Sequence, residues 1–261
     1  TGRISYSVMK EVDFSTSLLN GPMADTSLAV AFRELRTSTD PTEIHFLDVE
    51  PYLPSYDLPS AFLIAPVIFR GKNQGVLAFQ IPLSNLNTLM TSDGRWEDVG
   101  QGKTGETYVV SGDDFSLRSD PRMLLEDPER YLSLLAQQQL PGSLLEMIQS
   151  KRQAIMYQPA DTAGVRAARD GQSGSLSYTN YLGQPVVGAF APLEVDGVNW
   201  VILSEITQDE LNSFADDSLL AFSGSALLAA LLAIGVSVPI VRRLSRTLVR
   251  LVKDLTGASI Q

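Results

Sequence analysis

The sequence contains no cysteine and only one histidine, His45. These absences exclude disulfide bonds, thiolate nucleophiles and zinc sites built from cysteine and histidine, and a serine–histidine–aspartate triad would have to use His45. His45 lies among apolar neighbours, which predicts a half-buried strand residue, and a pH-sensing role is open to it. With so few catalytic groups, we expect no enzyme activity within these residues, no metal site and no cofactor.

Basic residues are scarce except at the C-terminal end. The formal charge is -10, from 20 basic and 30 acidic residues. Residues 242–261 hold five basic residues and one acidic residue, a balance of +4, so residues 1–241 carry -14. A body this acidic repels phosphate backbones, and we expect no nucleic-acid partner.

Charged residues are missing altogether from the 24 residues Ser218 to Val241. A helix of that length spans about 36 Å, which exceeds the roughly 30 Å of bilayer hydrocarbon. A buried core helix is the alternative, but no polar stripe interrupts the apolar surface. We therefore predict a transmembrane helix over residues 216–241. The arginines that follow it place the C-terminus in the cytoplasm and residues 1–215 outside.

Four leucines after the predicted span repeat at spacings of 4, 3 and 4: Leu244, Leu248, Leu251 and Leu255. This seam is typical of paired helices, and a basic helix lying on the lipid surface is the alternative. The predicted topology normally needs a signal sequence or an earlier span, and none precedes residue 1. We therefore expect the chain to be incomplete at its N-terminus.

The outer region contains an internal repeat. APVIFRGKNQGVLAFQI, residues 65–81, matches APLEVDGVNWVILSEI, residues 191–206, and each carries a glycine five residues after its proline. Both segments predict a strand, a glycine turn and a second strand. A weaker match between residues 4–14 and 106–115 predicts a strand that opens each unit.

Helical composition between these strands completes two similar modules. Residues 26–36, 121–139 and 143–157 have it, and Pro141-Gly142 separates the last two segments. Strands first and last with helices between them predict an α+β fold around antiparallel sheets. We place a membrane-distal module at 1–91, a linker at 92–101 and a membrane-proximal module at 102–215.

Four stretches resemble the double Cache sensor region of bacterial transmembrane receptors: KEVDFSTSLLNGP (10–22), YLPSYDLPSAFLIAPVIF (52–69), GKTGETYVVSGDDFSLRSDPRM (102–123) and YLGQPVVGAFAPLEVDGVNWVILSEI (181–206). The resemblance implies two PAS-like modules that bind a small molecule, in a homodimer held in the bacterial inner membrane. VPIVRRLSRTLVRLVKDLTG, residues 238–257, resembles the first helix of a HAMP linker.

The residue sequences PSYDLPSAF and GKTGETYVV are most similar to those of sensors in adenylate/guanylate cyclase receptors. Methyl-accepting chemotaxis receptors and histidine kinases use similar sensors and are the alternative outputs. The Arg-x-Trp-Tyr-like set of amino-acid-binding Cache modules is missing from this sequence. A membrane-anchored module that binds another protein is the alternative from a different functional class.

Two motifs invite a more specific interpretation. GQGKTG resembles the end of a phosphate-binding loop, but Glu97 stands where that loop needs glycine, and a strand-like segment follows. We predict a turn that leads into a strand. Asp113, Asp114 and Asp120 do not have calcium-loop spacing, and they predict an acidic turn with solvated carboxylates.

Ligand contacts are predicted in both modules. Pockets combine an apolar lining with a few polar groups, and aspartate can pair with an amine while tyrosines cover it. The alternative is that the tyrosines pack the sheets and the aspartates hold turns. Arg118 would suit an anionic group, or would form a surface salt bridge. The candidates are Asp48, Tyr52, Tyr56 and Asp57 in the distal module, and Tyr108, Arg118, Tyr178 and Tyr181 in the proximal one.

Overall fold

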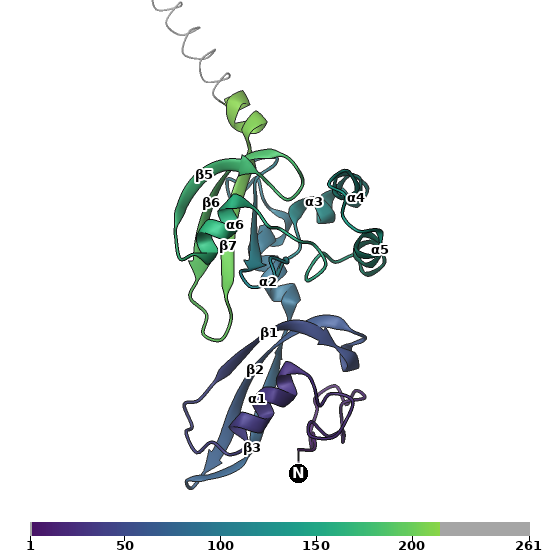
Figure 1. The fold of residues 1–261 in the computed structure, drawn as a ribbon, viewed down its shortest axis with the longest axis vertical. Coiled ribbons are helices and arrows are strands. Elements are labelled where there is room, and N and C mark those ends of the chain that lie inside the picture. Colours follow the sequence, from purple (N-terminus) through teal and green to yellow (C-terminus); the bar gives the residue numbers. More distant parts are fainter. Residues whose placement is uncertain (1, 215–261) are drawn as a thin grey trace, which may run out of the picture. The chain divides into compact units, whose positions relative to one another are not determined.

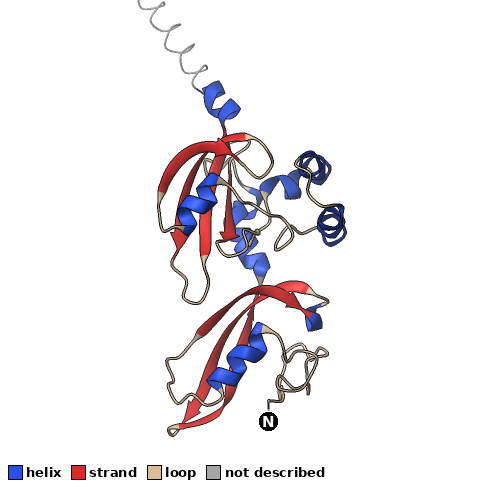
Figure 2. Cartoon of the chain, in the orientation of Figure 1, coloured by secondary structure: helices blue, strands red, loops and turns tan. Residues whose placement is uncertain are grey.

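A computed structural model describes residues 2–214 of the chain. The predicted span at 216–241 and the HAMP-like helix lie outside the described residues. Within the part that is described, no helix is long and apolar enough to cross a membrane. The chain divides into a unit Thr1–Gln208, which holds two antiparallel sheets, and a unit Asp209–Gln261, whose described residues are helical (Figures 1 and 2).

The distal sheet has three strands in the order β1-β2-β3: β1 (His45–Tyr52), β2 (Leu58–Phe69) and β3 (Lys72–Ile81). A short 3-10 turn, η1 (Leu53–Ser55), joins the first two. Helix α1 (Ser27–Leu35) packs its apolar face on this sheet, where Leu35 meets Phe62 and Ile64. Thr26 begins the helix by accepting a hydrogen bond from the Ala29 N–H at 3.2 Å. The helix predicted at 26–36 is confirmed.

The proximal sheet has four strands in the order β4-β7-β6-β5. They are β4 (Glu106–Ser111), β5 (Gly174–Thr179), β6 (Pro185–Leu193) and β7 (Trp200–Thr207), and α6 (Ala163–Arg169) packs against the last three. Helices α3 (Arg122–Glu126), α4 (Pro128–Gln137) and α5 (Gly142–Lys151) enclose a core with them (Figure 1). The α+β class with antiparallel sheets is confirmed.

Of the predicted helical segments, one is interrupted and another ends early. Residues 121–139 form two helices, because the non-helical backbone of Asp127 ends α3 and its side chain caps α4 by accepting from the Arg130 N–H. Residues 143–157 are helical only to Lys151, because Arg152 takes a left-handed conformation with φ 50°. In both places one residue with non-helical backbone angles ends the helix, although the composition of the segment is helical.

Both predicted hairpins form, and they are the repeated unit. Gly71 between β2 and β3 and Gly197 between β6 and β7 have φ of 73° and 92°, which favours glycine at each turn. In the proximal module β4 pairs with β7, the second strand of its hairpin. The equivalent strand β3 has no such neighbour within residues 2–214, and its Leu77 and Phe79 are 48% and 58% exposed.

The strand predicted in residues 4–14 is wrong. The segment holds no strand or bridge, the isolated bridge between Arg3 and Ser17 lies just outside it, and Tyr6, Val8 and Met9 are at least 74% exposed. Its backbone folds back on itself instead, with the Ile4 N–H donating to the Thr16 carbonyl at 3.0 Å. A β-branched run needs a neighbouring edge to become a strand, and this run finds none among the described residues.

The two sheets share buried side chains. Val49, Ala61 and Leu83 of the distal module pack with Val109, Ile155 and Trp200 of the proximal one. Helix α2 (Leu83–Thr91), followed by the short η2 (Ser92–Gly94), contacts both β2 and β4. The chain then runs through residues 95–105, where Trp96 is buried against the Arg122 guanidinium, 4.7 Å from its ring centre.

Candidate functional site

Two predicted ligand contacts, Asp48 and Arg118, meet Trp200 at the junction of the modules. The Arg118 guanidinium donates to both carboxylate oxygens of Asp48 on β1, each at 2.8 Å. The Trp200 indole N–H donates to Asp48 at 2.8 Å as well. Arg118 is only 3% exposed and Asp48 is 30% exposed, so the salt bridge is largely buried and differs from the surface salt bridge expected as the alternative to a ligand contact. The pair is buried because it lies next to apolar residues of both modules.

The distal candidates do not share one pocket: of the four, only Tyr56 lines the groove found in this module. Tyr52 is buried, packs edge-to-face on Phe62 and donates a hydrogen bond to Asp13 at 3.3 Å. Burial and the Asp13 charge raise its pKa. Tyr56 is 88% exposed and borders an open groove of about 390 Å³, while the Asp57 carbonyl accepts from Lys151.

His45 lies where the sequence predicts it, whereas the acidic turn is only partly solvated. His45 opens β1 with its side chain 32% exposed, as predicted, and lies 3.3 Å from a Glu43 oxygen. Asp114 accepts from the Ser116 backbone and hydroxyl. Asp120 is buried, contrary to the expectation of a solvated carboxylate, because it accepts from the Ala154 N–H at 2.7 Å and from Asn87.

The proximal module buries two carboxylates on facing strands. Glu106 of β4 and Glu205 of β7 are direct partners in the strand register, and they are 7% and 4% exposed. Directly opposed residues of an antiparallel pair have Cβ atoms about 5 Å apart, and like charges there repel. Two buried carboxylates in that position cost stability unless another group compensates them.

Three tyrosines supply hydrogen bonds to this pair. The Tyr108 hydroxyl donates to Glu205 at 2.5 Å, and the Tyr178 hydroxyl donates to the same oxygen. The Tyr181 hydroxyl donates to Glu106 at 2.7 Å. The structure thus brings together three of the four predicted proximal residues and leaves Arg118 at the module junction. The other oxygen of Glu205, Oε2, is buried with no hydrogen-bond partner among the described residues.

Tyr178 is positioned by two glycines. A Cβ atom at Gly188 would lie 2.5 Å from its hydroxyl, and one at Gly164 would lie 2.7 Å from it. Both distances are far below van der Waals contact, so only glycine lets the phenol reach Glu205. Gly188 on β6 and Gly164 on α6 are therefore part of the site's construction.

Burial is the main reason that both carboxylates hold protons more tightly than usual. Burial and then the charge of Glu205 raise the pKa of Glu106 to about 7. Burial also raises the pKa of Glu205, although hydrogen bonds from Tyr108, Tyr178 and Asn180 work against it. Both carboxylates therefore keep their protons to higher pH than an exposed glutamate does, and they titrate as one coupled unit.

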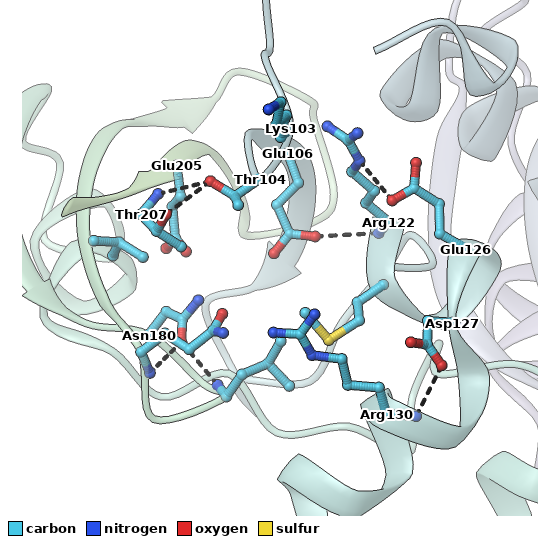
Figure 3. Close-up of a pocket in the computed structure, with 14 residues that line it drawn as sticks. Lys103, Thr104, Glu106, Arg122, Glu126, Asp127, Arg130, Asn180, Glu205 and Thr207 are labelled. Carbon is cyan, nitrogen blue, oxygen red and sulfur yellow. Dashed lines mark hydrogen bonds and ion pairs between the residues drawn. The ribbon is translucent and has the colours of Figure 1, made fainter. Parts of the chain in front are cut away.

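A cavity of about 140 Å³ opens beside the two carboxylates. Figure 3 shows Glu106 and Glu205 at one space, which Asn180 and Arg130 also border. The Arg122 guanidinium points away from the pair: it binds Glu126 at 3.0 Å and the carbonyl oxygens of Gly102 and Gly105 at 2.9 Å. Its backbone N–H donates to Glu106 at 3.1 Å. Glu106 and Glu205 form one side of this small pocket, its floor, and the rest of the lining is mixed, with basic side chains such as Arg130 and apolar ones such as Leu182.

Sequence reasoning missed the two glutamates. The turn predicted from GQGKTG is confirmed, since β4 starts at Glu106 immediately after it. Alternation along β4 puts Glu106 on the face of Tyr108, and alternation along β7 puts Glu205 on the face of the buried Leu203. The sequence did carry one signal for this site, because each glutamate occupies a strand position whose side chain points into the core.

The chain matches no family in a comparison with protein families and no curated protein. Solved structures are similar to it in fold. The periplasmic sensory domain of the Campylobacter jejuni chemoreceptor Tlp1 aligns at 11% identity and a TM-score of 0.43, over 75% of this chain and 58% of that one.

Two further solved structures align with similar scores. The ligand-binding domain of the Pseudomonas fluorescens chemoreceptor CtaA in complex with L-leucine aligns at 12% identity and a TM-score of 0.37, over 69% of this chain and 58% of that one. A methyl-accepting chemotaxis protein X aligns at 13% identity and 0.43, over 70% and 55%. The chain thus spans less than two thirds of the length of each.

Proposed function

We propose that residues 1–215 are the extracytoplasmic ligand-sensing region of a bacterial receptor, and that the ligand binds in the proximal pocket. One observation carries the site: two buried carboxylates face each other at a cavity, and Glu205 keeps an oxygen there with no hydrogen-bond partner in the described part of the chain. Perturbed titrating groups beside a concave site favour function over scaffolding. We propose Tyr108, Tyr178 and Tyr181 as residues that orient the two carboxylates toward the ligand.

The position of Glu205 suggests how binding is relayed. It lies two residues before the end of β7 at Thr207, and the chain becomes helical from residue 208 toward the predicted span. A ligand that pulls on Glu205 acts on the strand that leads to the membrane. It biases the receptor only as far as it prefers one of two arrangements of that strand.

The remaining steps rest on the sequence resemblance. We propose a homodimer in the inner membrane whose HAMP-like helix passes the change to a cytoplasmic output, for which a nucleotide cyclase is the first choice. A chemotaxis or histidine-kinase output is the alternative. Asp48 and Arg118 satisfy each other, and we propose them as the link between modules.

The topology is testable because the chain has no cysteine of its own. A Leu89→Cys variant, at a position that is 71% exposed, should react with a membrane-impermeant maleimide in intact bacteria. A Ser259→Cys variant should react only after the cells are broken. Labelling in the reverse pattern would contradict an extracytoplasmic sensor.

The site is testable by ligand screening of the full chain in detergent. A compound from a panel of amines, carboxylates and amino acids, present at 100 times its Kd, should stabilise the fold by about 3 kcal/mol, seen as a rise in Tm. Glu205→Gln should remove this shift. The distal double variant Tyr56→Ala with Asp57→Ala should keep it. The opposite result would move the site to the distal groove.

A further inference from the structure

We propose that the ligand of the proximal pocket is a small organic cation, a short aliphatic ammonium ion that pairs with Glu106 and Glu205. This inference rests on the proposed ligand site and adds its chemistry. It follows from the charges around the pocket, the free acceptor on its floor and its size.

Neither Glu106 nor Glu205 forms an ion pair with any residue of the described part of the chain. Three cationic residues line the pocket as well, Lys103, Arg122 and Arg130, and the Arg122 guanidinium is held by Glu126 and by two backbone carbonyls. Once the pair has lost its protons, above about pH 7 for Glu106, the floor carries negative charge that is not paired in an ion pair of the described residues. Buried charges are normally paired, so an external cation is the partner that this floor fits.

The hydrogen-bonding groups point the same way. An ammonium ion has three donors and no acceptor. The floor offers acceptors: within residues 2–214, Glu205 Oε2 is buried without a partner, and the Glu106 carboxylate accepts only from Tyr181 and the Arg122 N–H. A carboxylate ligand would meet two like charges here. A charge-assisted hydrogen bond from an amine is about twice as strong as a neutral one.

The cavity limits the size of the ligand. Its volume of about 140 Å³ equals roughly five waters at about 30 Å³ each. Met123, Leu182 and Val186 supply apolar lining for a short methylene chain. An amine with about five non-hydrogen atoms fits, and butylamine is a suitable probe.

The test compares three probes of equal length on the full chain in detergent at pH 8: butylamine, butan-1-ol and butyrate, measured by titration calorimetry. Butylamine should bind at least tenfold more tightly than the other two. Glu205→Gln and Glu106→Gln should each weaken it at least tenfold. Asp57→Asn in the distal module removes a carboxylate outside the pocket and should leave the affinity unchanged.

A pH series gives a second readout. Because the glutamate pair holds protons near neutral pH, butylamine must displace them, so its affinity should rise between pH 6 and pH 8 and the heat should depend on the buffer's own ionisation. A pH-independent affinity would contradict pairing with these carboxylates.

The outcomes separate this inference from the proposed site. If butyrate or butan-1-ol binds more tightly than butylamine and Glu205→Gln abolishes that binding, the site stands and the cation inference is overturned. The same holds if all three probes fail while the screen finds another ligand that needs Glu205. Butylamine binding that ignores both glutamine variants, with no screened ligand sensitive to them, would overturn the site as well.

Discussion

Replacing Asp48 with alanine should lower the free energy of unfolding by about 2–4 kcal/mol. The Arg118 guanidinium would stay buried, at 3% exposure, and would lose both of its short hydrogen bonds to Asp48. Breaking one side of a buried ion pair costs about 3–5 kcal/mol, and we expect somewhat less because Asp48 is 30% exposed and Asp114 stays near Arg118. Urea unfolding followed by tryptophan fluorescence measures the change.

The chain offers a matched control. Asp161 binds Arg166 through the same two-pronged geometry, at 2.7 and 2.8 Å, but both side chains are at least 40% exposed. Asp161→Ala should therefore cost at most about 1 kcal/mol. If Asp48→Ala were equally mild, the junction would not depend on this pair. Asp48 would then be free for the ligand contact that the sequence predicts.

The same variant tests whether the two modules unfold together. Val49 and Leu83 of the distal module share a buried cluster with Val109 and Trp200 of the proximal one. A common core predicts a single cooperative transition, which Asp48→Ala should shift as a whole. A variant that splits unfolding into two steps would show that the ion pair, more than the apolar cluster, couples the sheets.

The hairpins and helix α1 were predictable from the sequence because their signals are local. Gly71 and Gly197 each end an Ala-Pro-led run at a position that needs positive φ, and Thr26 is a standard helix cap. These features depend on neighbours within a few residues. They follow from the sequence without knowledge of the rest of the fold.

The site was only partly predictable because it depends on distant pairings. The sequence predicts Tyr108 and Tyr181 as ligand contacts, yet their hydrogen bonds go to Glu205 and Glu106, which a single sequence does not pair. Register between β4 and β7 joins segments about 100 residues apart. Arg118 shows the same limit, since its partner Asp48 lies in the other module.

The second large effect concerns pH. Raising the pH from 5 to 8 should lower the stability of the ligand-free chain, because burial raises the pKa of Glu106 to about 7 from an ordinary 4.5. The folded state then binds more protons than the unfolded state across that window. Its extra stability is fully present below pH 4.5 and is lost as the pH rises through 7. A shift of this size amounts to at most about 3 kcal/mol, or roughly 5–10 °C in Tm.

A double variant isolates this effect from the general repulsion in a chain of charge -10. Glu106→Gln with Glu205→Gln keeps the size of both side chains but removes their titration. It should flatten most of the fall in Tm between pH 5 and 8, and the remaining slope measures repulsion elsewhere. Glu129→Gln removes one charge from the first turn of α4 and should keep the wild-type slope. Equal slopes for the wild type and the double variant would mean that the buried pair does not take up protons in this range. The rise in butylamine affinity between pH 6 and pH 8 would then have no proton displacement behind it.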